Sequence, residues 1–366
     1  MKPIMSYIMP YKKHLLLWVA LAFWILPIAG QDGGGDPETE GDEGVYIEPD
    51  PPEPEFVWSL DWSPDGHHLA FAVGADRCNN IQNDYHIYIL DTVSGAVLGN
   101  IGNFLSRCAI TSLKWNPAGD KIAFSGFRQP MDVWDVSAKQ LISGKAFTTA
   151  DGYIDLEWNP DGIRIASIQG GSTRVTISDP LTGQDFFSFE ANQLSSIDWS
   201  PDGSKLVTTQ AGILIWEATT GTLLDMLDVG VVAVIEWSPD GTMFAGTSSN
   251  NQIKVWDAAT GQILRTFKGH SSAVHEVRWR KDSRMIASAS QDSTVRLWDV
   301  VTGYQFDTFT SIAPIYAVAW SPDGTQLAFG GEGNNGEITI VTPDFSTILI
   351  PTPTITSTKR PHPNPP

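Results

Sequence analysis

The residue types that carry enzymatic chemistry are present in the sequence, but they stand in no catalytic pattern. The 366 residues include seven histidines and 42 acidic residues, yet no His-Glu-x-x-His, Gly-x-Ser-x-Gly, phosphate-loop or dinucleotide-binding motif. His67 and His68 follow a Pro-Asp-Gly turn, where adjacent side chains of a strand point to opposite faces. A solvated turn explains them better than a metal site. The sequence therefore predicts no catalytic residue, no bound metal and no cofactor.

Carboxylates also gather in residues 31–56, which hold ten acidic residues and no basic ones. Asp36, Glu38 and Glu40 resemble the start of a calcium loop, but Ile47 stands where an EF-hand needs its bidentate Glu. The many Gly and Pro residues and the self-repelling charge predict an acidic linker. Residues 351–366, with six prolines and four threonines, predict an extended, disordered tail.

Residues 1–30 have the features of a secretion signal. An apolar run at residues 15–26 follows a positively charged segment and is followed by Pro27-Ile28-Ala29-Gly30. The run is shorter than the ~20 residues that span a bilayer. We expect export with cleavage near Gly30 and no membrane insertion afterwards; an uncleaved anchor and a buried helix are the alternatives. The basic residues are Lys2, Lys12 and Lys13.

The overall charge excludes several classes of partner. Lys and Arg number 23 against 42 Asp and Glu, a formal net charge of −19. A non-sequence-specific nucleic-acid binder must neutralise phosphates with basic residues, and an anionic membrane surface would repel the chain. The hydrophobic share of 42% is ample for a packed core, which excludes wholesale disorder.

One short phrase recurs along the middle of the chain and predicts its architecture. Trp-Ser-Pro-Asp-Gly or a close variant begins at seven tryptophans, which lie 38 to 53 residues apart. Alternating apolar residues precede each copy, and the Pro-Asp-Gly sequence favours a tight turn into a second strand. The seven tryptophans are Trp62, Trp115, Trp158, Trp199, Trp237, Trp279 and Trp320.

A second phrase, Trp-Asp or Trp-Glu, follows the first by 17 to 28 residues and ends a third strand. Its best copies are at Trp134, Trp216, Trp256 and Trp298; of the remaining tryptophans outside residues 1–30, only Trp58 lies off this register. Four short antiparallel strands per ~40 residues make a propeller blade. Residues 57–350 therefore predict an all-β, seven-bladed β-propeller of four-stranded antiparallel blades, with Trp rings between blades.

Two segments of the sequence are candidates for the outer strand that completes blade 7 and closes the ring. Residues 345–350 have the character of a strand and would complete blade 7 in chain order. The alternative is that residues 45–47 complete blade 7 from the N-terminal side.

The sixth unit resembles a complete WD40 repeat, from Gly269-His270 to Trp298-Asp299. The resemblance implies a hydrogen-bonded tetrad of His270, Ser288 (or Ser290), Asp292 and Trp298, and hence a structural role for His270. The other units resemble WD40 repeats only through their two phrases. Units 1 and 7 look as much like periplasmic TolB-type propeller repeats. The resemblance strongly supports a propeller fold but says little about function.

The two cysteines lie in loops that this architecture places on one face of blade 1. Cys78 follows the second strand of that blade, and Cys108 lies in the connection to blade 2. In an exported chain their adjacency predicts a Cys78–Cys108 disulfide, worth roughly 3–4 kcal/mol if unstrained. Two free thiols are the alternative.

The residue before each blade-opening Trp is charged in six of seven units. These residues lie on the innermost strand, opposite the buried Trp, and burying them dry would be costly. We expect a wet ring of charge lining the channel, or else inter-blade ion pairs that bind no ligand. The residues are Asp61, Lys114, Glu157, Asp198, Glu236, Arg278 and Ala319.

The loops of blades 1 and 2 are the strongest candidates for a binding surface, because Arg and aromatic residues are enriched in binding hot spots. Ordinary loop composition is the alternative. The candidates are Arg77, Phe104, Arg107, Phe127 and Arg128.

Taken together, these features predict an exported, monomeric, non-catalytic platform for a protein partner. A carbohydrate or small-ligand binder using the channel mouth is the first alternative. A hydrolase or lyase centred in the channel is the second, and the missing catalytic motifs count against it.

Overall fold

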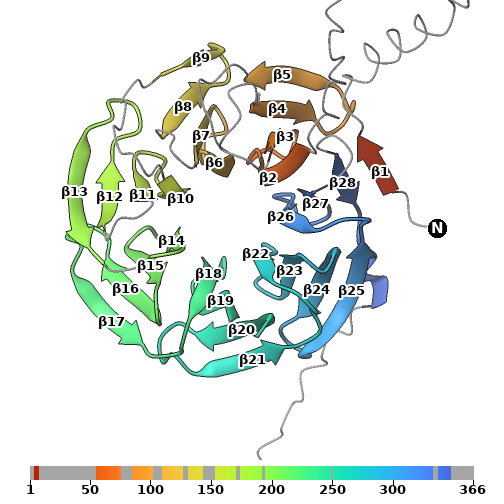
Figure 1. Cartoon of the computed structure of the whole chain (residues 1–366). Coiled ribbons are helices and arrows are strands. Elements are labelled where there is room, and N and C mark those ends of the chain that lie inside the picture. The colour runs from red at the N-terminus through yellow and green to blue at the C-terminus, as the bar shows by residue number, and fades with distance from the viewer. Residues whose placement is uncertain are drawn as a thin grey trace, which may run out of the picture.

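A computed structural model describes residues 4–7, 55–75, 85–101, 109–126, 131–142, 153–169, 174–191, 194–248, 250–332 and 337–347. These residues form seven four-stranded antiparallel sheets arranged around a central channel (Figure 1). The only helix among them is a single 3-10 turn. The predicted seven-bladed β-propeller is confirmed.

Blades 1 to 6 follow the chain, and each runs from the channel to the rim (Figure 1). Blade 1 comprises β2 (Glu55–Trp62), β3 (His68–Ala75), β4 (His86–Asp91) and β5 (Val97–Ile101). Blade 2 comprises β6 (Ile110–Trp115), β7 (Lys121–Gly126), β8 (Asp132–Asp135) and β9 (Gln140–Leu141). Blade 3 comprises β10 (Tyr153–Trp158), β11 (Ile165–Gln169), β12 (Arg174–Ser178) and β13 (Asp185–Glu190).

The next three blades repeat the same order. Blade 4 comprises β14 (Ile197–Trp199), β15 (Lys205–Thr209), β16 (Ile213–Glu217) and β17 (Leu223–Leu227). Blade 5 comprises β18 (Val232–Trp237), β19 (Met243–Ser248), β20 (Gln252–Asp257) and β21 (Ile263–Phe267). Blade 6 comprises β22 (Val274–Trp279), β23 (Met285–Ser290), β24 (Thr294–Asp299) and β25 (Tyr304–Thr310).

Blade 7 takes its outer strand from the beginning of the chain. Its order from the channel is β26 (Ile315–Trp320), β27 (Leu327–Gly331), β28 (Ile338–Val341) and β1 (Ile4–Tyr7). β1 pairs antiparallel with β28, and Figure 1 shows it at the rim of the ring. β1 lies inside residues 1–30, so cleavage near Gly30 would separate it from the ring.

The expectation that residues 345–350 form this outer strand is wrong. Phe345–Thr347 are a 3-10 helix, η1. Pro343 follows β28 and has no N–H to donate to a ladder, and the Asp344 carboxylate accepts the Ser346 amide at 3.0 Å, which turns the chain. Phe345 instead packs on Phe306 and Trp320, with ring centroids 5.5 and 6.1 Å apart. Residues 45–47 lie outside the described residues.

The Ser-Pro-Asp-Gly turns share one geometry, which side-chain hydrogen bonds stabilise. In blade 1 the Ser63 hydroxyl donates to Asp65 at 2.5 Å, and Asp65 accepts the His67 amide at 2.9 Å. Gly66 has φ +74°, a conformation that favours glycine. The same serine–aspartate bond recurs at Ser200, Ser238 and Ser321.

The blade-opening tryptophans join adjacent blades by hydrogen bonds as well as by packing. Six of the seven indoles donate to the carbonyl of the residue before the Trp of the preceding blade, for example Trp158 to Lys114 at 3.1 Å and Trp199 to Glu157 at 3.0 Å. Trp237 is the exception: it packs against Phe244, and its buried indole nitrogen has no partner among the described residues.

Among the described residues no helix is long and apolar enough to cross a membrane. Residues 8–54 and the C-terminal tail lie outside the described part of the chain. Glu55 and Phe56, at the end of the predicted linker, instead begin β2.

Candidate functional site

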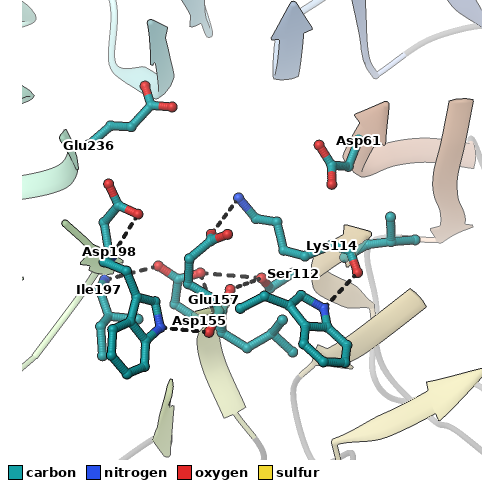
Figure 2. Close-up of polar contacts among 12 residues, drawn as sticks. Asp61, Ser112, Lys114, Asp155, Glu157, Ile197, Asp198 and Glu236 are labelled. Carbon is teal, nitrogen blue, oxygen red and sulfur yellow. Dashed lines mark hydrogen bonds and ion pairs between the residues drawn. The ribbon is translucent and has the colours of Figure 1, made fainter. Parts of the chain in front are cut away.

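The inner strands enclose a polar cavity of about 170 Å³ in the central channel. All seven inner strands contribute residues to its lining. The side chains that alternate with the buried Trp residues point toward the channel. The lining includes Lys114, Glu157, Asp198 and Arg278 from the ring of charge expected from the sequence. Asp61 and Glu236 also point toward the channel (Figure 2).

Basic members of this ring form ion pairs. The Lys114 ammonium lies 2.7 Å from Glu157, which joins blades 2 and 3. The Arg278 guanidinium lies 2.5 Å from Glu276 on its own strand and 3.9 Å from Glu236 of blade 5. The inter-blade ion pairs that were the alternative to a solvated ring of charge are therefore present, between Lys114 and Glu157 and between Arg278 and Glu236.

Acidic members of the ring hold the inner edge of the next blade. Asp61 accepts the backbone amide of Trp115 at 2.8 Å, Asp198 that of Trp237 at 2.7 Å, and Glu236 that of Trp279 at 2.6 Å. An inner strand is the edge of its sheet, so this amide has no ladder partner, and a buried amide without a partner is costly. Each carboxylate thus supplies the partner that the neighbouring sheet lacks.

A second tier of side chains lies two residues earlier on each inner strand. Asp155 accepts hydrogen bonds from the Ser112 hydroxyl of blade 2 and from the Ser196 hydroxyl and Ile197 amide of blade 4, at 3.1 to 3.2 Å (Figure 2). Glu276 accepts the Val318 amide of blade 7 at 2.6 Å. One carboxylate of blade 3 therefore joins three blades.

The junction of blades 7 and 1 lacks these polar side chains. Ala317 and Ala319 occupy the two channel-facing positions, and the Trp62 indole donates to the Ala319 carbonyl at 3.3 Å. The contact is apolar and close: a Cβ at Gly330 of blade 7 would lie 2.9 Å from Val57 Cβ of blade 1. Packing replaces hydrogen bonding at the place where the ring closes.

Aromatic side chains of blades 1, 6 and 7 line one side of the cavity. Trp58 stacks on Phe56 and on Tyr316, with ring centroids 5.3 and 5.2 Å apart, and His275 meets Tyr316 edge-on at 4.8 Å. Trp58, His275 and Tyr316 all line the cavity. We call Phe56, Trp58, His275 and Tyr316 the aromatic mouth.

β-Bulges place these residues at the mouth. The register of the inner strand shifts at Trp58 in blade 1, at His275 in blade 6 and at Tyr316 in blade 7. A bulge inserts one unpaired residue and re-aims its side chain. Sequence reasoning missed this site, although the one tryptophan off the repeat register was its signal.

The four residues proposed as a tetrad are joined in one chain of hydrogen bonds. His270 Nδ1 lies 2.9 Å from Asp292, His270 Nε2 lies 2.7 Å from the Ser288 hydroxyl, and the Trp298 indole donates to that hydroxyl at 2.8 Å. Ser290 instead donates to the Ala273 carbonyl at 2.8 Å. The chain runs within blade 6 and does not line the channel cavity.

The family comparisons agree with this geometry. The WD40 model (WD domain, G-beta repeat) matches residues 52–81 and 261–299, which cover the start of blade 1 and most of blade 6. Two segments of the chain are thus similar to WD40 repeats, and the structure is a seven-bladed β-propeller. The model of eukaryotic translation initiation factor eIF2A matches residues 145–268, across blades 3 to 5. No curated protein matches the chain.

Burial makes several of the channel carboxyls weaker acids. Burial raises the pKa of Asp61 to about 6 and that of Glu236 to about 7. Burial and the neighbouring Glu157 and Glu236 raise the pKa of Asp198. Burial lowers the pKa of the Lys114 ammonium, but the surrounding carboxylates raise it by more. The pKa of Lys114 therefore lies above its usual range, and the side chain stays charged.

The binding and disulfide predictions fall on a part of the propeller that the structure does not describe. Arg77, Phe104, Arg107, Phe127 and Arg128 lie outside the described residues, as do Cys78 and Cys108. Both remain predictions. Within the described ranges, no group of three or more His, Cys, Asp or Glu side chains is arranged to hold a metal ion.

Proposed function

We propose that the protein is a non-catalytic platform that binds a protein partner over the aromatic mouth of its channel. Propellers with WD40 repeats typically bind protein partners. The observation that carries the proposal is the stack of Trp58 on Tyr316, at 5.2 Å, beside a polar cavity. Both side chains are partly exposed although both are large and aromatic, and such residues dominate binding hot spots.

The hydrogen bonds of the channel carboxylates support a structural role for them in place of a catalytic one. Asp198 accepts the Trp199 amide through one oxygen and the Trp237 amide through the other. Both oxygens of Asp155 are engaged in the same way. A general acid or base needs an oxygen within reach of a substrate proton, and these oxygens are bonded to the backbone or to side chains of the ring.

A carbohydrate is the second candidate ligand, because an aromatic platform beside polar groups suits a sugar ring. The hydroxyls near the mouth argue against it. Ser112 and Ser196 donate to Asp155, and Ser195 is bonded to Thr209 at 2.8 Å. These hydroxyls are committed to the propeller, which leaves few donors for a sugar.

We also propose that the protein is exported, on the strength of the charged and apolar pattern of residues 1–30. If residues 1–30 stay uncleaved, the acidic linker would tether the ring. Arg107 and Phe127 of blades 1 and 2 remain candidates for a second contact with the partner. Intact-mass measurement of the protein in each cell fraction tests export and the cleavage point. The eIF2A match covers repeated blade structure, and we draw from it the fold alone.

Site-specific photocrosslinking tests the binding proposal. A photoreactive phenylalanine at His275 should capture a discrete protein in the source cells, and the Trp58→Ala/Tyr316→Ala double variant should abolish the capture. The matched control places the same group at Tyr304, which is 76% exposed on the outer strand β25. Identical crosslinks from both positions, or none from either, would contradict the proposal.

A further inference from the structure

We infer that the partner inserts an arginine side chain through the aromatic mouth into the channel cavity. This inference rests on the proposed function and names the chemistry that the mouth recognises. Three features of the described residues lead to it: the charge of the lining, the volume of the cavity and the aromatic residues beside it.

The cavity and the channel beside it hold more acid than base. Six carboxyl groups face two basic side chains, Lys114 and Arg278. Glu157 and Glu276 pair with these two at 2.7 and 2.5 Å. Of the other four, only Glu236 approaches a cation among the described residues, at 3.9 Å. Asp61, Asp155 and Asp198 have no ion pair within 4.0 Å among the described residues, although Lys114 lowers the pKa of each.

The pKa values of these groups show that a further cation would stabilise them. Burial raises the pKa of Asp61 to about 6 although Lys114 and Arg278 lower it, so the two basic side chains only partly offset the cost of burying its charge. A guanidinium brought into the channel would supply that charge. Its binding would lower these pKa values and release protons at neutral pH, since linkage between the two equilibria is reciprocal.

The size of the cavity suits one side chain. Its volume of about 170 Å³ is many times the ~10–15 Å³ that one water needs. An extended side chain of a partner fits in it, while the backbone that carries it stays outside on the mouth.

The mouth favours arginine over lysine. A guanidinium is weakly hydrated and interacts well with aromatic rings, whereas an ammonium holds its water more strongly.

Capped tripeptides test the inference on the full chain. Calorimetry at pH 7.5 should detect binding of acetyl-Gly-Arg-Gly-amide, with the citrulline peptide at least tenfold weaker and the lysine peptide between them. Citrulline keeps the shape of arginine and removes its charge. Binding of the arginine peptide should release protons, measured as a dependence of the heat on buffer ionisation.

Variants assign the binding to the cavity. Asp198→Asn keeps an acceptor for the Trp237 amide and removes a charge, and should weaken arginine binding about tenfold. Asp225→Asn on the exposed rim strand β17 is the matched control and should leave it unchanged. Equal binding of the arginine and citrulline peptides, no binding of either, or an unchanged affinity in folded Asp198→Asn would overturn the inference. Crosslinked capture of a protein at the mouth without any arginine preference would leave the proposed function intact.

Discussion

Asp198 in blade 4 accepts a hydrogen bond from the backbone amide of Trp237 in blade 5, at 2.7 Å. The two residues are 39 positions apart and belong to different sheets. The bond supplies the ladder partner that the inner edge of blade 5 lacks, and the same relationship joins Asp61 to Trp115. The charged residues of the channel therefore join adjacent sheets. The carboxyl groups that exceed the basic side chains in number give the channel an acidic character that a cationic ligand would complement.

Truncating such a carboxylate should destabilise the ring. Asp198→Ala leaves the Trp237 amide without a partner and should lower the free energy of unfolding by about 1–3 kcal/mol. Asp198→Asn keeps an acceptor and should lose less. Denaturant unfolding followed by tryptophan fluorescence measures both. The matched Asp225→Ala variant on the exposed strand β17 should change stability little; an equal loss in both alanine variants would contradict the role of Asp198.

The channel also sets the pH dependence of stability. Burial raises the pKa of Asp61 to about 6 and that of Glu236 to about 7. Their contribution to the free energy of unfolding is therefore fully present at low pH and is lost as the pH rises through these values. Hydrogen bonds from Ser200 and Ser204 lower the pKa of the turn residue Asp202 to about 2, and its contribution is lost below about pH 4. The free energy of unfolding should therefore be largest near pH 4–5 and smaller at pH 8.

Unfolding in urea from pH 3 to pH 8 measures this profile. The Asp61→Asn/Glu236→Gln double variant keeps acceptors for the Trp115 and Trp279 amides and should flatten the decline above pH 5. Asp202→Asn should instead alter the limb below pH 4. A stability that rises steadily from pH 5 to pH 8 would show that these carboxyls are not buried as described.

The tetrad of blade 6 can be compared with simpler versions in its neighbours. Ser288 bonds both His270 and Trp298, whereas Thr208 of blade 4 bonds Trp216 alone at 2.9 Å. Ser288→Ala leaves two buried donors or acceptors unpaired and should cost about 2–4 kcal/mol; Thr208→Val leaves one and should cost about 1–2 kcal/mol. Thermal unfolding of both variants tests the order, and a larger loss for Thr208→Val would contradict it.

Blade 5 shows why the tetrad is incomplete elsewhere. Gly246 occupies the position of Ser288, and the indole nitrogen of Trp256 is buried without a partner among the described residues. A Cβ at Gly246 would lie 2.6 Å from the Val234 carbonyl, so a serine cannot be placed there without moving the bulged inner strand. The bulge at the channel thus determines the residue behind it.

The outer strand of blade 7 gives a prediction about processing. A chain that begins at Gln31 lacks β1, so β28 becomes the edge of its sheet. Its backbone amides should exchange with solvent deuterium at least tenfold faster than in the full chain, while those of β24 in blade 6 stay unchanged. Equal exchange of β28 in both chains would show that β1 does not protect it.

The sequence predicted the fold because its signals are local and repeated. Each Trp-Ser-Pro-Asp-Gly turn from Trp62 to Trp320 marks the same place in a blade, and strict alternation places Asp61 or Glu236 opposite the buried Trp. Bulges break this alternation by one residue, which moves a side chain to the other face. Trp58 and Tyr316 were therefore not recognised as one site. β1 was missed because its partner, β28, lies more than 330 residues away.

The most direct test of the account measures one affinity. The protein captured by crosslinking at His275 should bind the intact propeller in calorimetry, and Trp58→Ala should weaken that binding at least tenfold, since the residue stacks on Tyr316 beside the cavity. Tyr304→Ala on the rim should leave it unchanged. An unchanged affinity in a correctly folded Trp58→Ala variant would contradict the central claim that the aromatic mouth is the binding site.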